Sequence, residues 1–348
     1  MGEKRVIMKF TQRGVIVISV ALAGLAPAAT AMAATPVASA GRDTAPSAQT
    51  CGRVIATIPV GRIPQEVAVN PATNTVDVAN RGGKVSVING QTDKVIANIP
   101  VGYSLFGIAT DPATNTVYAT HGTAAAGKVA VINGRTDRVV ATIPVGADAA
   151  GVAVNPATNT AYVANILDDT VSVINGSTDT VSATIPVGPA PFGVAVNPKT
   201  NTAYVTSGNF KLFVIAGRTH TLAATVPMTA GATGVAVNPA TNTAYVTNGE
   251  NPGAVSVLNG QTDKVVATIP VGQLLQGVAV NPATNTVYAA NSVVPGTVSV
   301  INGQTNTVTA TIPVGAAPYG VAVNPKTGTV YVTNSGDGTV SVIAPCRK

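Results

Sequence analysis

The sequence is poor in the side chains that most catalytic and metal sites use. Its 348 residues include two histidines, two cysteines and no tryptophan, and charged residues make up only 10% of the chain. After Ala26 no apolar run approaches the roughly 20 residues that a membrane span requires, although the mean hydropathy is +0.35. Thr, Asn, Val, Ala and Gly are abundant instead. This composition suits many short strands joined by turns.

The net charge of the chain is concentrated near its start. The formal charge is +6, and residues 1–33 hold four basic residues against Glu3, which accounts for +3 and leaves +3 for the remainder. The other basic residues are scattered and form no cluster in the sequence. This distribution argues against a dedicated nucleic-acid surface.

The N-terminus has the form of a secretory signal peptide. Residues 1–13 are basic, Val15 to Ala26 is apolar, and Ala31-Met32-Ala33 offers a small-x-small cleavage site. Ala38-Ser39-Ala40 is a second candidate site, so cleavage follows Ala33 or Ala40. An uncleaved anchor is the alternative, but the apolar segment is short for a span. We therefore expect a secreted or cell-envelope protein with no transmembrane segment once the signal peptide is removed.

After a predicted flexible linker at residues 34–50, residues 51–348 repeat one unit. An Asn/Asp-Pro-x-Thr element recurs seven times at intervals of 41 to 44 residues. Its copies begin at Asn70, Asp111, Asn155, Asn197, Asn238, Asn281 and Asn324. Each unit reads as four short strands with turn signals between them, and a period of roughly 40–45 residues with four strands is typical of a propeller blade. The sequence predicts an all-β, seven-bladed β-propeller with four antiparallel strands per blade.

Two segments of the repeat carry a family resemblance. Tyr245-Val246-Thr247-Asn248 and Tyr331-Val332-Thr333-Asn334 resemble the YVTN family of β-propeller repeats, and Tyr204-Val205-Thr206 nearly matches it. The resemblance covers about residues 54–344. It implies the propeller fold and a protein of the exported or surface type. It implies no ligand or reaction, because propellers carry many unrelated functions.

The two ends of the repeat region complement each other. Residues 54–60 match a fourth strand but precede any first strand, whereas the seventh repeat stops after its third strand at 339–343. We expect these segments to pair in a composite last blade, which would also remove two exposed sheet edges. Cys346 and Cys51 flank the place of the missing turn, so an exported protein is expected to join them in a disulfide. Two free thiols are the alternative.

The repeat pattern also assigns packing and turn residues. A tyrosine recurs in the second strand, where neighbouring blades leave more space, and we interpret it as a packing residue. These tyrosines are Tyr118, Tyr162, Tyr204, Tyr245, Tyr288 and Tyr331. The first turn ends on an Asn that becomes Gly328 in the last repeat, an exchange that indicates a left-handed backbone position. A recurrent Gly in the third turn, such as Gly90, is expected to serve the same purpose.

Variation among the copies is confined to one face of the predicted disc. The loops joining strands one to two and three to four are nearly uniform, whereas the other loops differ from blade to blade. The residues before each first strand should ring the central channel on the variable face. They are Gln65, Phe106, Ala150, Phe192, Thr233, Gln276 and Tyr319.

We predict that a ligand binds at this ring, with Gln65, Glu66, Phe106, Phe192, Gln276 and Tyr319 as its contacts. Aromatic rings and amides would suit a glycan, a peptide or protein, or an apolar small molecule. The alternative is that these loops vary only because nothing constrains them.

The first repeat departs most from the others. Glu66 stands where most copies have Gly, and Asp77 replaces the tyrosine. A carboxylate at a packed position is costly unless it is paired or hydrated. We expect a salt bridge with Arg62 or Arg81, or exposure to solvent, in preference to a binding role for either carboxylate.

Enzymatic interpretations find little support in the residues. Propeller enzymes of the lactonase and streptogramin-lyase kind, which resemble this fold, rely on carboxylate, histidine and metal clusters in the channel. His121 and His220 are predicted on opposite faces, and Asp168-Asp169 is typical of a solvated turn rather than a calcium site. No cofactor is expected. We therefore interpret the chain as a non-catalytic, monomeric binding or scaffold propeller, with a channel-site metal-dependent hydrolase or lyase as the alternative.

Overall fold

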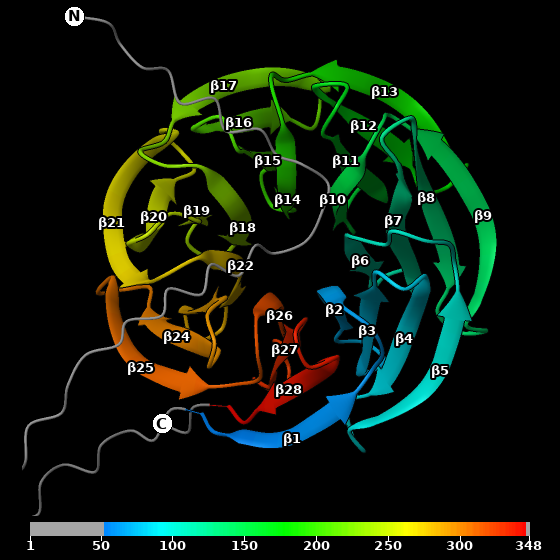
Figure 1. Cartoon of the computed structure of the whole chain (residues 1–348). Helices are drawn as coiled ribbons and strands as arrows, with labels where there is room; N and C mark the ends of the chain where they lie inside the picture. The colour runs from blue at the N-terminus through cyan, green and yellow to red at the C-terminus, as the bar shows by residue number, and fades with distance from the viewer. Residues whose placement is uncertain (1–51, 346–348) are drawn as a thin grey trace, which may run out of the picture. The chain divides into compact units, whose positions relative to one another are not determined.

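In the computed structural model, residues 52–345 are described, and they form 28 strands and no helix. The strands make seven four-stranded sheets arranged as blades around a central axis (Figure 1). All neighbouring strands within a blade pair antiparallel, as at β12 and β13. The chain divides into two units, Met1–Pro46 and Ser47–Lys348, and the propeller belongs to the second. The predicted all-β, seven-bladed fold is confirmed.

The seven blades follow the sequence repeat. Blade 1 comprises β2 (Pro64–Asn70), β3 (Thr75–Asn80), β4 (Lys84–Asn89) and β5 (Lys94–Pro100). Blade 2 comprises β6 (Ile108–Asp111), β7 (Thr116–Thr123), β8 (Ala126–Asn133) and β9 (Arg138–Val145). Blade 3 comprises β10 (Ala149–Asn155), β11 (Thr160–Asn165), β12 (Thr170–Asn175) and β13 (Thr180–Pro186). Blade 4 comprises β14 (Pro191–Asn197), β15 (Thr202–Ser207), β16 (Lys211–Ala216) and β17 (Thr221–Pro227).

The remaining blades include the composite one. Blade 5 comprises β18 (Ala232–Asn238), β19 (Thr243–Asn248), β20 (Gly253–Asn259) and β21 (Lys264–Gly272). Blade 6 comprises β22 (Leu275–Asn281), β23 (Thr286–Asn291), β24 (Thr297–Asn302) and β25 (Thr307–Pro313). Blade 7 comprises β26 (Pro318–Val323), β27 (Val330–Asn334), β28 (Thr339–Ile343) and β1 (Val54–Pro59), in the order β1-β28-β27-β26.

Blade 7 contains strands from both ends of the described chain (Figure 1). β1 pairs antiparallel with β28, with Val54 opposite Ile343 and Pro59 opposite Thr339. The predicted disulfide partners, Cys51 and Cys346, lie outside the described residues. None of the described residues forms a helix that is long and apolar enough to cross a membrane.

The core lies between the blades rather than within one sheet. The second and third strands of each blade are almost wholly buried, because a neighbouring blade covers each face. The six repeat tyrosines are at most 3% exposed, which confirms their packing role. The hydroxyls of five of these tyrosines, Tyr118, Tyr162, Tyr204, Tyr245 and Tyr331, lie against the third-turn glycine of the following blade, as Tyr204 does at Gly260. The tyrosine thus fills the widening gap between blades.

Amide hydrogen bonds join the blades on the uniform face. The Asn that ends a first strand donates from Nδ2 to the Oδ1 of the left-handed Asn in the next blade, over 2.7–2.8 Å. The donor–acceptor pairs are Asn70–Asn115, Asn155–Asn201, Asn197–Asn242, Asn238–Asn285 and Asn324–Asn74. The Oδ1 atom of the same first Asn accepts a backbone N–H two residues later, as Ala72 donates to Asn70. The uniform face is therefore constrained by its own packing.

The turn predictions were half right. Gly328 has a φ of +74° and its Asn counterparts have φ values of +49 to +58°, which confirms the left-handed position in the first turn. In the third turn the left-handed residue is the one before the fourth strand, such as Asp93 with a φ of +54°, so the prediction for Gly90 was wrong. A Cβ on Gly90 would lie 2.8 Å from the Tyr331 hydroxyl. Gly is required there because Asn74 of the same blade and the tyrosine of the preceding blade leave no room for a side chain.

Candidate ligand site at the centre of the propeller

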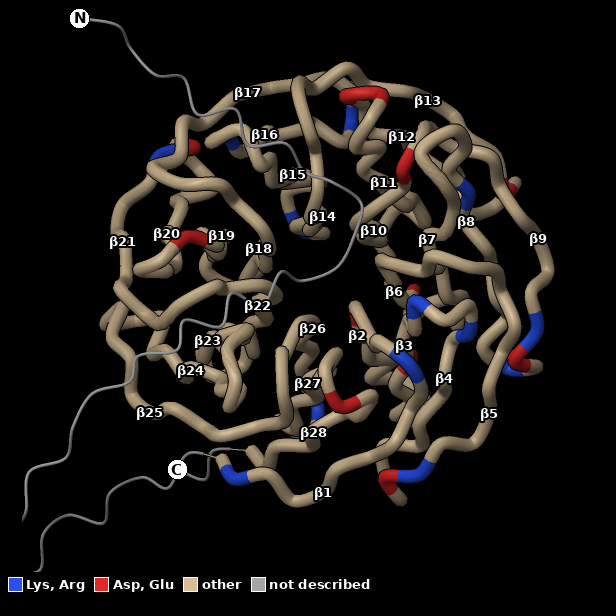
Figure 2. Tube along the Cα trace, in the orientation of Figure 1, with Lys and Arg blue, Asp and Glu red and all other residues tan. Residues whose placement is uncertain are grey.

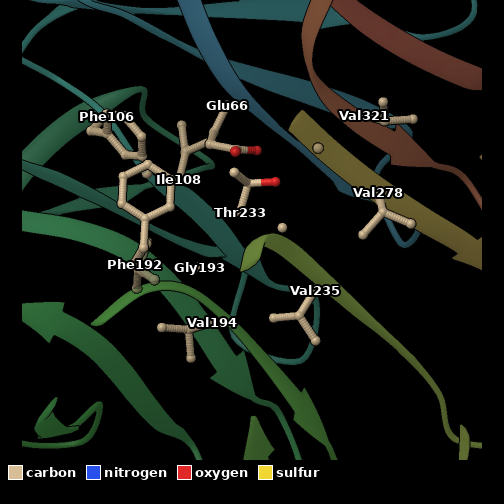
Figure 3. A pocket seen from close by; sticks show the side chains of 15 residues that line it. Glu66, Phe106, Ile108, Phe192, Gly193, Val194, Thr233, Val235, Val278 and Val321 are labelled. Carbon is tan, nitrogen blue, oxygen red and sulfur yellow. The ribbon is translucent and has the colours of Figure 1, made fainter. Parts of the chain in front are cut away.

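The first strands of the seven blades surround a cavity of about 170 Å³ at the centre of the propeller (Figure 3). Glu66 is the only ionisable residue among its lining residues, the rest being Gly, Val, Ile, Phe and Thr. Of the predicted contacts, Glu66, Phe106 and Phe192 line this cavity, together with Thr233 of the predicted ring. Elsewhere, Lys, Arg, Asp and Glu are scattered around the propeller (Figure 2).

A ring of glycines allows the backbones of neighbouring blades to approach closely around this cavity. Six blades have glycine at the same position of the first strand, namely Gly107, Gly151, Gly193, Gly234, Gly277 and Gly320. A Cβ on Gly277 would lie 2.5 Å from the carbonyl oxygen of Tyr319 in the next blade. Real Cβ contacts are not that short, so side chains are excluded at these positions. Glu66 occupies the seventh position, beside blade 2, whose first strand is shortened to four residues at Ile108–Asp111.

The three aromatic residues of the predicted ring pack on one another. The ring centroids of Phe106 and Phe192 are 5.0 Å apart with an interplanar angle of 71°. Phe106 also meets Tyr319 at 5.8 Å and 88°. These edge-to-face contacts join blades 2, 4 and 7, which are not neighbours, so the rings converge across the channel. Each ring remains partly exposed.

The two glutamines of the predicted ring occupy different surroundings. Gln65 is buried and 5% exposed, and its backbone carbonyl accepts the Thr333 hydroxyl. Gln276 is half-buried, and its carbonyl accepts the Thr247 hydroxyl at 2.6 Å. Neither side chain lines the cavity.

Threonine hydroxyls link neighbouring blades at the depth of the cavity. The Thr247 hydroxyl accepts the Gly234 N–H at 2.8 Å within its own blade and donates to the Gln276 carbonyl of the next. The same bridge occurs at Thr120, Thr206 and Thr333, which donate to the carbonyls of Ala150, Thr233 and Gln65. This is the structural role of the threonine in the Tyr-Val-Thr segment, and sequence reasoning missed it.

A blade that lacks the bridging threonine is followed by a blade with an aromatic residue in the ring, and a blade that has the threonine is not. Blades 1, 3 and 6 carry alanine in place of the threonine, at Ala79, Ala164 and Ala290. The residue of the next blade that would receive the hydroxyl is then aromatic in all three cases, at Phe106, Phe192 and Tyr319. In the four blades with threonine this residue is Ala, Thr or Gln. The aromatic positions thus change together with a second position in a different blade.

Glu66 projects its carboxylate into the cavity (Figure 3). Burial raises the pKa of this carboxyl to about 7, and the N–H of Val67 acts in the opposite direction. Glu66 is half-buried and lines the cavity. Burial raises the pKa of the Tyr319 hydroxyl, the Glu66 charge raises it further, and Arg81 lowers it. No ion pair forms between Glu66 and Arg62 or Arg81, so the expected salt bridge is absent.

Asp77 lies between blades 1 and 2, away from the cavity. It is 4% exposed and accepts the Thr110 hydroxyl at 3.3 Å, so the expectation of a salt bridge or solvent exposure was wrong. The other six blades have valine at the position of Thr110. The polar residue in blade 2 therefore supplies a hydrogen-bond donor to the carboxyl in blade 1. Burial raises the pKa of Asp77 to about 7, with Thr110 opposing and Asp137 adding to the shift.

The other titratable residues considered in the sequence do not form a cluster in the described structure. His121 lies on β7, where burial, and then Lys128, lower its pKa. Asp168 accepts the Ala147 N–H at 2.8 Å and Asp169 accepts the Ala190 N–H at 3.0 Å, so both carboxylates hold loops in place. Across residues 52–345 no three His, Cys, Asp or Glu side chains come together as a candidate metal site.

Comparison with known proteins defines the fold and nothing finer. No protein-family model matches the chain, and no curated protein matches it in sequence. A chain of hydrazine synthase from Kuenenia stuttgartiensis is similar in structure, with a TM-score of 0.74 and 18% identity over 83% of this chain and 97% of that chain. At this identity the likeness shows a shared architecture only. The protein is a seven-bladed β-propeller, and the resemblance to YVTN repeats stays a prediction.

Proposed function

We propose that this chain is an exported, non-catalytic binding protein whose ligand enters the central channel from the variable-loop face. The ligand contacts Phe106, Phe192 and Tyr319 at the mouth and approaches Glu66 below them. Export is supported by the N-terminal sequence pattern, and the protein acts as a monomer because one ring holds the whole site. A protein segment, a glycan or a small molecule could each supply the group that enters.

The observation that supports this proposal most strongly is the location of the residues that depart from the repeat consensus. Three aromatic side chains stand where the other blades have Ala, Thr or Gln, and one carboxylate stands where they have Gly. All four residues lie near the central cavity. The aromatic residues change together with Ala79, Ala164 and Ala290 in neighbouring blades. Loops that vary only for lack of constraint would not show this coordination. A functional site that interrupts a regular pattern is the expected exception to local rules.

One observation favours the alternative of a channel-site hydrolase or lyase. A carboxyl with a pKa of about 7, as burial gives Glu66, suits a general acid or base near neutral pH. A second acid or base is missing from the described lining of the cavity. Binding therefore ranks above catalysis, and turnover of a bound panel compound is the result that would reverse this order.

A ligand panel of sugars, peptides and small molecules tests the proposal. Binding is measured by calorimetry on the intact protein and on a variant with Phe106→Ala, Phe192→Ala and Tyr319→Ala. The matched control carries Gln91→Ala, Gln261→Ala and Gln304→Ala, three exposed side chains in third turns of the uniform face. We expect the aromatic variant to lose binding by about tenfold or more, because buried aromatic contacts dominate small-ligand sites. Loss of binding in the control variant alone would overturn the proposal.

A further inference from the structure

The cavity at the channel centre holds a charge without a counter-charge. Among the described residues Glu66 is the only ionisable side chain that lines it, and its carboxylate points into the open space (Figure 3). In the described structure Glu66 forms no ion pair, and Arg62 and Arg81 do not reach it. A carboxylate in an enclosed space is costly unless a cation or strong donors accompany it. The cavity therefore supplies one half of an ion pair.

The walls around this carboxylate suit an organic cation better than a hydrated metal ion. Phe106 and Phe192 line the cavity, and Tyr319 packs on Phe106 at the mouth. The faces of aromatic rings attract ammonium groups, and methylated ammonium groups above all. The remaining lining is Gly, Val, Ile and Thr, with Thr233 as the only hydroxyl. Hard metal ions require several oxygen ligands, and the lining side chains offer only the Glu66 carboxylate and the Thr233 hydroxyl.

The size of the cavity limits the ligand further. Its volume is about 170 Å³. Liquid water occupies about 30 Å³ per molecule, so the space is equivalent to roughly five or six water molecules. Pockets that bind drug-sized ligands have volumes of roughly 300–1,000 Å³. A compact ammonium compound, or the ammonium end of a longer molecule, fits this space.

We propose that the central cavity binds a small organic cation, with Glu66 as its counter-ion and Phe106 and Phe192 as its aromatic wall. This inference rests on the proposed function and names its ligand class. The cation enters past the aromatic residues from the variable-loop face. Glu66 replaces the glycine that the other six blades carry at this position, so blade 1 alone places a charge in the cavity and selects a cation.

Matched cationic and neutral ligands test the charge requirement. Choline is titrated against its neutral isostere 3,3-dimethylbutan-1-ol, and tetramethylammonium serves as a more compact cation. Calorimetry is done on the intact protein at pH 8.5, where the Glu66 carboxyl is ionised. We expect at least one of the two cations to bind about tenfold or more tightly than the neutral alcohol. Equal binding of the alcohol and the cations, or no binding of either cation, would overturn the inference.

Variants separate the counter-ion from the fold. Glu66→Gln keeps the shape and removes the charge, so we expect the cation to lose about tenfold in affinity while the alcohol is unaffected. Asp77→Asn removes a buried carboxylate outside the cavity and serves as the control, with choline binding unchanged. Cation binding that persists in Glu66→Gln would contradict the role of Glu66. If sugars or other neutral panel compounds bind and the aromatic variant loses them, the proposed function stands and the cation inference alone fails.

Discussion

Asp77 provides a quantitative test of the packing between blades 1 and 2. Its carboxyl is 4% exposed and has the Thr110 hydroxyl as a donor at 3.3 Å. Burial raises its pKa from 3.8 to about 7. Asp77→Asn keeps the shape and the oxygen acceptor for Thr110 but cannot ionise. The substitution therefore removes the cost of a buried charge and little else.

The sign and size of the effect follow from proton linkage. Between pH 4 and pH 7 the folded protein keeps a proton on Asp77 that the unfolded chain has lost, so the contribution of Asp77 to stability falls as the pH rises. Above pH 7 the loss is complete. A shift from 3.8 to about 7, at about 1.4 kcal/mol per pH unit, corresponds to up to about 4 kcal/mol. We expect Asp77→Asn to stabilise the protein by that amount at pH 8.5 and by almost nothing at pH 4.

The assay is urea unfolding of both proteins at intervals from pH 4 to pH 8.5. Taking the difference between variant and parent at each pH cancels the titration of other groups, including Glu66, whose pKa is raised in the same range. Glu250→Gln, which removes an exposed carboxylate on the variable face, is the control and should show a small difference at every pH. A stability difference for Asp77→Asn that is the same at pH 4 and pH 8.5 would refute the reasoning.

Three further substitutions test individual contacts, each by urea unfolding. Asp111→Asn should stabilise by about 1 kcal/mol, because Asp111 Oδ2 and Asn159 Oδ1 both lack partners where other blades form the amide bond; a destabilised variant would contradict this. Gly277→Ala should cost roughly 1–3 kcal/mol or more, since its Cβ would lie 2.5 Å from the Tyr319 carbonyl, whereas a neutral result would show that the blades can separate. Thr247→Val should cost about 1–3 kcal/mol through loss of the bridge from Gly234 to Gln276, and the matched Thr243→Val, in an exposed turn pair with Thr241, should cost less.

Much of the fold could be predicted because each blade repeats the same local solution. The Asn-to-Gly328 exchange identified a left-handed turn, and the recurrent tyrosines identified the packing between blades. The role of Gly90 could be read only in part from its own repeat, since a Cβ there would strike Asn74 and also the hydroxyl of Tyr331, which is more than 200 residues away in sequence. A single repeat contains no information about its neighbour's side chains.

The candidate site was predictable in position but not in geometry. The repeat alignment placed Phe106, Phe192 and Tyr319 at one mouth of the channel. Their mutual contact depends on the width of the channel, which seven blades set together. Of the two alternatives expected for Glu66, a salt bridge or solvent exposure, the salt bridge is absent and the residue is half-buried, because Arg62 and Arg81 are exposed whereas the carboxylate lines the cavity. Comparing each strand-two residue with the first strand of the next repeat would have exposed the threonine bridge.

The central claim, that the ligand enters the channel between the aromatic residues, is tested most directly by NMR of ring-labelled phenylalanine. The chain has five phenylalanines, which gives a sparse spectrum. Phe106 and Phe192 line the cavity, whereas Phe213 is buried within β16 of blade 4. On saturation with a bound panel compound, the account predicts shifts in the Phe106 and Phe192 signals and none in that of Phe213. A bound compound that leaves both channel signals unmoved would contradict it.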